Sequence, residues 1–170
     1  MFIRGVNFNK LIMEQYSKII YHKRYARQNK MKIKVDLKKC IGCGVCELAC
    51  SLKYHGAFRI SMARIQVDKG PETILIKKTF EVHVCNQCDD APCVSRCPEG
   101  ALSKDPKSGV VKVDENKCIG CSLCIQACLY NAIWVDSTKM KAFKCQLCDE
   151  TQPVCINLCP RNALSIGGIQ

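Results

Sequence analysis

The sequence predicts an α+β fold of many small elements, and two patterns support this prediction. Short apolar runs flank turn-forming residues at several places, which is typical of strands and hairpins. Cysteines recur in groups of four, and we expect a short helix to start near the last cysteines of each group. Aromatic residues make up only 6% of the chain, so a core of side chains alone would be thin.

Three segments carry the strand patterns. The run "ARIQVDKGPETILIKKTFEVHVC" predicts strands at Ile65–Val67, Thr73–Lys77 and Phe80–Val84 around a Lys-Gly-Pro turn. In "EGALSKDPKSGVVKVDENK", an Asp-Pro-Lys-Ser-Gly turn separates two apolar runs and predicts a β-hairpin. The segment "NAIWVDSTKMKAFKC" has the same form around "DSTK", so a second hairpin is expected there.

The 16 cysteines fall into four quartets with none left over. We number these quartets one to four along the chain. They are Cys40, Cys43, Cys46 and Cys50; Cys85, Cys88, Cys93 and Cys97; Cys118, Cys121, Cys124 and Cys128; and Cys145, Cys148, Cys155 and Cys159.

The quartets repeat along the chain. "VDLKKCIGCGVCELAC" and "VDENKCIGCSLCIQAC" are near copies whose starts lie 78 residues apart, since 113 − 35 = 78. Quartets two and four each end in Cys-Pro and are followed by "GALS" and "NALS". The chain is therefore interpreted as a duplicated unit of two quartets.

The spacing inside a quartet indicates iron–sulfur chemistry. A C-x2-C-x2-C loop can hold three corners of an Fe4S4 cube, and Gly42, Gly44 and Gly120 would let the backbone approach closely. The fourth cysteine follows after a gap of three residues instead of two; in two-cluster ferredoxins it points away and binds the neighbouring cluster. Zinc sites instead use two separated C-x2-C pairs or Cys/His mixtures, so zinc is the weaker alternative.

Charge and targeting signals bear on compartment and partners. The formal charge is +11 with cysteines counted as neutral, but four oxidised clusters would add roughly −8 and leave about +3. A nucleic-acid partner is therefore not expected. No secretory signal and no apolar run of transmembrane length are visible, so we expect a cytoplasmic protein rather than a disulfide scaffold.

The four-quartet layout resembles the electron-transfer subunits of the dimethyl sulfoxide reductase iron–sulfur family, over residues 31–170. The run "CELACSLKYHGAFRISMARIQV" is similar to shorter members that accompany tungstopterin aldehyde oxidoreductases. The resemblance implies two interleaved bacterial-ferredoxin-like units of βαββαβ type around four [4Fe-4S] clusters. It implies unit A at residues 31–84 plus 129–170, and unit B at residues 85–128.

The same resemblance implies that quartets one and four, and quartets two and three, exchange their last cysteines. We call the four expected ligand sets sites I to IV. Site I is Cys40, Cys43, Cys46 and Cys159; site II is Cys145, Cys148, Cys155 and Cys50; site III is Cys85, Cys88, Cys93 and Cys128; site IV is Cys118, Cys121, Cys124 and Cys97. The residues alone also permit quartet one to pair with two and quartet three with four.

Other residues are expected to play lesser parts. His55, His83 and Trp134 are interpreted as ordinary packed or surface residues. Residues 1–30 form a basic extension without cysteine, either a helical docking segment or a start set too far upstream. Six basic residues are expected to be mostly solvated. The alternative, functional interpretation is that they dock an acidic partner or raise the reduction potentials of nearby clusters. The six residues are Lys53, Arg59, Arg64, Lys77, Lys78 and Arg96.

The sequence predicts a non-catalytic electron-transfer subunit. It contains no nucleotide, flavin, zinc-hydrolase or radical-enzyme motif. The expected partner is a large tungsten- or molybdenum-pterin oxidoreductase, and a ferredoxin or another electron-carrying subunit could exchange electrons with it. An anaerobic source would suit such clusters. The alternatives are a carbon monoxide dehydrogenase or hydrogenase partner, a freestanding polyferredoxin, and a zinc-binding module that contacts nucleic acid.

Overall fold

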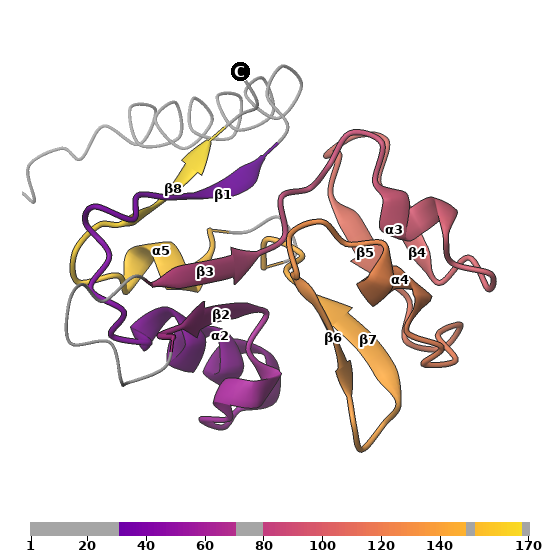
Figure 1. Cartoon of the computed structure of the whole chain (residues 1–170), viewed down its shortest axis with the longest axis horizontal. Coiled ribbons are helices and arrows are strands. Elements are labelled where there is room, and N and C mark those ends of the chain that lie inside the picture. Colours follow the sequence, from indigo (N-terminus) through magenta and orange to yellow (C-terminus); the bar gives the residue numbers. More distant parts are fainter. Residues whose placement is uncertain (1–30, 71–79, 149–151, 168–170) are drawn as a thin grey trace, which may run out of the picture.

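The computed structural model describes residues 31–70, 80–148 and 152–167 as short helices and strands in four antiparallel pairs (Figure 1). The strands pair as β1 with β8, β2 with β3, β4 with β5, and β6 with β7. In chain order the elements are β1 (Lys32–Val35), α2 (Val45–His55), a 3-10 turn (Ile60–Met62), β2 (Ile65–Asp68), β3 (Glu81–Val84), α3 (Pro92–Ser95), β4 (Leu102–Lys104), β5 (Val111–Val113), α4 (Leu123–Gln126), β6 (Ile133–Asp136), β7 (Lys141–Lys144), α5 (Val154–Asn157) and β8 (Leu164–Gly167).

The predicted local elements are confirmed where the structure describes them. Strands β2 and β3 pair with Ile65 opposite Val84, close to the expected positions. The two predicted hairpins are β4–β5 and β6–β7. Each quartet also contributes a helix, from α2 to α5. The expected strand Thr73–Lys77 and the basic extension at residues 1–30 lie outside the described residues.

One strand pair joins distant parts of the chain. Strand β1 runs antiparallel to β8, with Ile33 opposite Ile166. Helix α2 packs against α5 in the same half of the molecule, and α3 packs against α4 in the other half (Figure 1). Residues near the start and end of the described chain therefore fold together, while the middle of the chain forms its own helix pair.

Helix α2 is longer than the other helices. It is framed by Gly44 and Gly56, both left-handed, and the Gly56 N–H donates to the Leu52 carbonyl. Helices α3, α4 and α5 each have only four residues. Because α2 continues, Cys46 and Cys50 lie one turn apart on a regular helix. The chain after quartet one therefore takes a different path from the chain after the other three quartets.

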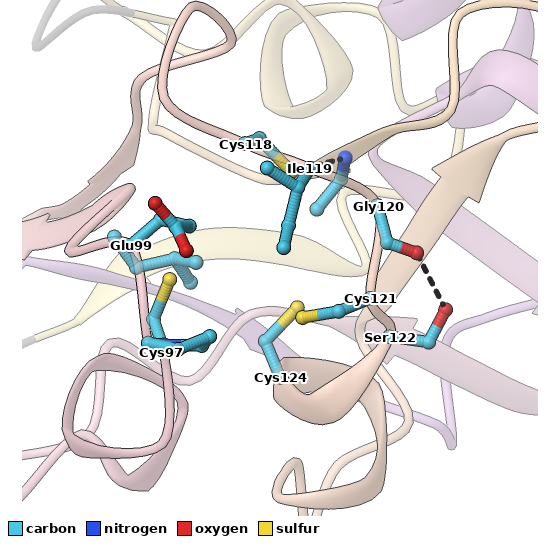
Figure 2. Close-up of a pocket in the computed structure, with 11 residues that line it drawn as sticks. Cys97, Glu99, Cys118, Ile119, Gly120, Cys121, Ser122 and Cys124 are labelled. Atoms are coloured by element: carbon cyan, nitrogen blue, oxygen red, sulfur yellow. Dashed lines mark hydrogen bonds between the residues drawn. The ribbon is translucent and has the colours of Figure 1, made fainter.

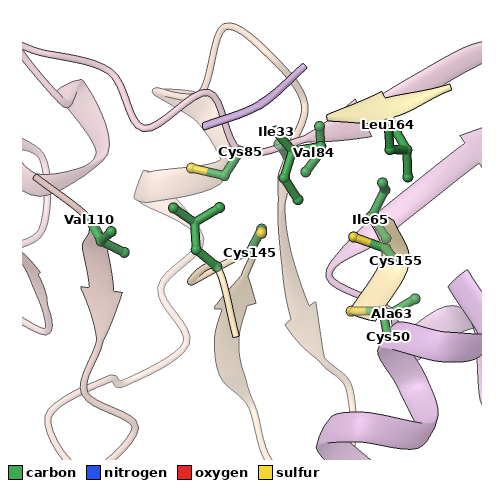
Figure 3. Packing of buried hydrophobic residues seen from close by; sticks show 12 residues of the cluster. Ile33, Cys50, Ala63, Ile65, Val84, Cys85, Val110, Cys145, Cys155 and Leu164 are labelled. Atoms are coloured by element: carbon green, nitrogen blue, oxygen red, sulfur yellow. The ribbon is translucent and has the colours of Figure 1, made fainter. Parts of the chain in front are cut away.

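Cysteines are a large part of the buried core. One cluster of buried residues combines Ile33, Ile65, Val84 and Leu164 with thiols from quartets one, two and four (Figure 3). A second cluster groups apolar residues of β4 to β7 with cysteines of quartets two and three. The thin apolar core that the composition predicts is therefore built around sulfur.

Candidate metal centres

Site IV surrounds a hollow between the loop after α3 and the start of α4. Cys97, Cys118, Cys121 and Cys124 all line it, together with apolar atoms of Leu102, Ile119 and Ala142. Figure 2 shows Cys97 facing Cys121 and Cys124 across this hollow. Three of these thiols come from quartet three and one from quartet two.

Sites I and III line two further hollows in the same manner. Cys40, Cys43 and Cys46 line one of them with Cys159, which follows α5 at the other end of the chain. Cys85, Cys88 and Cys93 line the other with Cys128, which follows α4. In each hollow, three thiols of one quartet meet the last thiol of a distant one.

Site II lies inside the core. Cys50, Cys145 and Cys155 are all buried in one cluster, shown in Figure 3. Negative charge on Cys50, Cys145 and Cys148 would repel that on Cys155, and Cys148 acts on Cys50 in the same way. The structure therefore brings Cys50, from α2, to the three thiols of quartet four.

The donor atoms suit a soft, multi-metal cluster. All sixteen cysteines are free thiols. Within the described ranges, no three His, Cys, Asp or Glu side chains converge to hold a single metal ion. The thiols of sites I, III and IV instead stand around hollows. The other walls of sites I and IV are largely apolar, while the hollow of site III is also lined by Lys32, Asn86, Asp89 and Asp90. Thiolates at the corners of such a space are the ligands that [4Fe-4S] clusters require.

A repeated turn positions the last cysteine of quartets two, three and four. The Sγ atoms of Cys97, Cys128 and Cys159 accept a hydrogen bond from the N–H of an alanine four residues on, at 3.3, 3.5 and 3.3 Å. The residue before that alanine, Gly100, Asn131 or Asn162, has a positive φ. Glycine and asparagine tolerate this conformation best, so a C-x2-[G/N]-A pattern encodes the turn.

Cys50 breaks this pattern because α2 runs on past it. Its Sγ accepts instead from the N–H of Arg64, fourteen residues later, at 3.2 Å. The Arg64 side chain is buried, and its guanidinium lies 3.6 Å from the centre of the Tyr54 ring. Arg64 was expected to be solvated, and this expectation is wrong: a cation–π contact holds it beside site II.

The glycines of the cluster loops also let the backbone pack closely against other segments of the protein. Gly42 and Gly120 both have positive φ. A Cβ on Gly42 would overlap the ring of Phe80, and one on Gly120 would overlap the carbonyl of Met140. These glycines therefore let the first loops of quartets one and three pack against neighbouring segments.

Burial strongly disfavours free thiolates. Desolvation raises the pKa of Cys46 and of Cys145 to about 12 and that of Cys93 to about 11. After desolvation, the negative charge of Glu47 and of neighbouring thiolates contributes to the raised pKa of Cys46, and neighbouring thiolates contribute to the raised pKa values of Cys93 and Cys145, where Lys144 acts in the opposite direction. Such thiols stay protonated in the empty fold, so metal ions must supply the positive charge that stabilises the thiolates.

Two buried polar residues between sites II and III were missed by sequence reasoning. Lys144 is completely buried, and its ammonium donates to the carbonyls of Val111 and Cys145. Gln87 is 1% exposed and bridges the same two residues: its Nε2 donates to the Cys145 carbonyl at 3.0 Å, and its Oε1 accepts from the Val111 N–H at 2.9 Å. The only sequence signal is their position next to cysteines, in "FKC" and "CNQC".

Comparison with known proteins bears directly on these centres. Residues 76–169, more than half of the chain, match the 4Fe-4S dicluster domain. The chain belongs to the 4Fe-4S dicluster domain family. This confirms the iron–sulfur prediction against the zinc and disulfide alternatives.

The relatives of this dicluster protein include three named subunits of oxidoreductases. It is 43% identical over 132 residues to the NADH-dependent phenylglyoxylate dehydrogenase subunit beta of Aromatoleum evansii, covering 78% of the chain but only 29% of that relative. It is 36% identical to the thiosulfate reductase electron transfer subunit PhsB of Salmonella typhi, covering 78% of the chain and 72% of the relative. It is 37% identical to the polyferredoxin-like subunit of the aliphatic sulfonate oxidoreductase of Pyrococcus furiosus, covering 78% and 73%.

One of these relatives is named as an electron transfer subunit and another as a polyferredoxin-like subunit. All three relatives are named as subunits of oxidoreductases. The chain carries [4Fe-4S] clusters in an electron-transfer rather than a catalytic role. Among solved structures, an active-site complex BamBC of benzoyl coenzyme A reductase superposes with a TM-score of 0.46 at 20% identity, over 80% of this chain and 78% of that one.

In the described segments, no helix combines the length and apolar character needed to cross a bilayer.

Proposed function

We propose that this dicluster protein is the electron-transfer subunit of a larger oxidoreductase and carries four [4Fe-4S] clusters, one at each of sites I to IV. The observation that carries the proposal is the recurring composition of the sites. At each site, three thiols of one quartet meet the last thiol of another, in a pocket or in the core. Sixteen cysteines then serve as four complete ligand sets.

We propose further that the chain forms two interleaved ferredoxin-like units. Unit A, residues 31–84 plus 129–170, would include the β1–β8 pair and the α2–α5 pair. Unit B, residues 85–128, would include the β4–β5 hairpin and the α3–α4 pair. The β6–β7 hairpin packs against α4 and β5, so it would link the two units.

The exposure of the cysteines suggests the path of the electrons. Cys43 of site I and Cys121 of site IV are the two exposed thiols, while all four thiols of site II and two of site III, Cys85 and Cys93, are buried. Sites I and II are linked through Cys46 and Cys155, and sites II and III through Cys145 and Cys85. Sites III and IV are linked through helix α3. The proposed electron path, which we call the wire, therefore runs through sites I, II, III and IV in that order, and its two ends lie at the surface.

The partner is proposed from sequence resemblance. The run "CELACSLKYHGAFRISMARIQV" favours a tungsten- or molybdenum-pterin oxidoreductase of the aldehyde oxidoreductase type. A carbon monoxide dehydrogenase or hydrogenase is the alternative partner. We propose that the complex works in the cytoplasm, where reduced thiols are available to assemble clusters.

Anaerobic native purification from the source organism tests this function. We expect about 16 irons per chain, together with a large subunit that contains tungsten or molybdenum in fixed stoichiometry. A matched preparation of the chain expressed alone controls for iron acquired without the partner. About 16 irons with no partner chain would favour a freestanding polyferredoxin, and zinc in place of iron would refute the wire.

A further inference from the structure

Lys144 occupies the boundary between the two inner sites. It is the last residue of β7 and directly precedes Cys145 of site II. Its side chain crosses to the carbonyl of Val111 on β5, a residue that lines the hollow of site III. Figure 3 shows Cys85 of site III and Cys145 of site II at this junction.

The ammonium of Lys144 is held in place by its surroundings. It has no solvent exposure, and in the described part of the chain its hydrogen-bond acceptors are the two neutral carbonyls of Val111 and Cys145. Gln87 hydrogen-bonds to the backbone of the same two residues and so helps to fix it. A cation so placed keeps its position when the charge of a nearby cluster changes, and its field is weakly screened.

The charge of Lys144 acts on both inner sites at once. It favours negative charge at Cys93 of site III and at Cys145 of site II. Two other lysines make similar bonds but lie nearer the solvent. Lys104 donates to the carbonyls of Cys88 and Asp89 and also faces the Asp89 carboxylate, and Lys141 donates to the Cys118 carbonyl. Only Lys144 among these three is fully buried and shared between sites.

We propose that Lys144 is a positioning residue for electron transfer: a buried, fixed cation that raises the reduction potentials of the clusters at sites II and III together. Reduction adds one negative charge to a cluster, and a nearby cation stabilises the reduced form. The shared charge keeps the two inner clusters close in potential, so that an electron crosses between the units without a large step. This inference rests on the proposed four-cluster function.

Redox titration of the full-length, cluster-loaded protein, followed by electron paramagnetic resonance, tests the proposal. The variants are Lys144→Gln, which removes the charge but keeps a donor, Lys144→Met, which removes both, and Lys144→Arg, which keeps the charge. Lys141→Gln is the matched control on the same strand. Signals of sites I and IV are identified by their change in Cys43→Ala and Cys121→Ala.

We expect Lys144→Gln and Lys144→Met to shift the oxidised-to-reduced ratio of both inner clusters at least about tenfold towards the oxidised form, which is 59 mV for one electron. The outer clusters should stay unchanged, and Lys144→Arg should restore the inner potentials. Lys141→Gln should affect site IV alone, and by less, because solvent screens that lysine.

Two results would overturn the role of Lys144. One is an unchanged inner potential in a Lys144→Gln protein with full iron content. The other is loss of iron from both uncharged variants, because that would assign Lys144 to assembly of the fold. A wild-type protein with too little iron for four clusters would instead refute the proposed function, so the two failures are distinguishable.

Discussion

Replacing Gln87 with methionine tests how the two proposed units are held together. The side-chain amide of Gln87, in the first loop of quartet two, joins the Cys145 carbonyl to the Val111 N–H. Methionine has a similar length and no branch at Cβ, so the cavity stays filled while both hydrogen bonds are lost. The variant therefore isolates the polar contribution of this junction.

The expected loss of folding free energy follows from the hydrogen bonds that the Cys145 carbonyl and the Val111 N–H retain in the variant. The Cys145 carbonyl keeps its bond from Lys144 at 2.9 Å, so losing Gln87 there costs about 1 kcal/mol. The buried Val111 N–H is left without an acceptor among the described residues, which costs about 1–2 kcal/mol more. Together these amount to about 2–3 kcal/mol. Because contacts that are broken in the transition state act on the unfolding rate, and we expect this junction to be broken there, unfolding accelerates by about 30- to 150-fold.

Cluster bleaching in anaerobic guanidinium measures this rate, because unfolding releases the clusters irreversibly. The visible absorbance of the clusters should decay about 30- to 150-fold faster in Gln87→Met than in the wild type. Gln126→Met is the matched control, since Gln126 is exposed on α4. A decay within about twofold of the control would show that the Gln87 bridge does not hold the units together.

Two further predictions follow from the turn motif and from thiol burial. Asn162→Ala should destabilise the fold by about 1 kcal/mol and speed bleaching several-fold, because alanine is strained at φ 47. Asn162→Gly should match the wild type, as Gly100 fills the equivalent position, and equal rates for the two variants would contradict the argument. Raised thiol pKa values favour the protonated empty fold, so its stability should be lost as pH rises from 9.0 towards about 12. Cluster loading in vitro should release protons and proceed further at about pH 8.5 than at about pH 6.5, measured by iron content; a reverse trend would contradict this.

The parts of the structure that were predictable have local signals. The β4–β5 and β6–β7 hairpins follow from turn residues between apolar runs, and the quartets follow from cysteine spacing. The β1–β8 pair was not predicted, because two strands of four residues near opposite ends of the described part of the chain carry no sign of their pairing. Long-range pairing depends on the folding of everything between the strands.

The expected ligand sets came from resemblance and not from spacing. Spacing alone also allowed Cys43 to share a cluster with Cys97, and the hairpin between quartets two and three favoured Cys159 only weakly. The structure places Cys159 in the hollow of quartet one and Cys97 in the hollow of quartet three. Lys144 and Gln87 had no readable signal, because a lysine or glutamine beside a cysteine is usually a solvated residue. Their burial depends on how the two halves meet.

Iron counts in two double variants test the nested ligand sets most directly. The variants are Cys43→Ala with Cys159→Ala, and Cys43→Ala with Cys97→Ala, each compared with the single substitutions. If loss of one ligand removes a whole cluster, each single variant retains about 12 of 16 irons. The nested sets predict about 12 irons for the Cys43/Cys159 pair and about 8 for the Cys43/Cys97 pair. The reverse result would contradict the account, because it would mean that quartet one exchanges its last cysteine with quartet two.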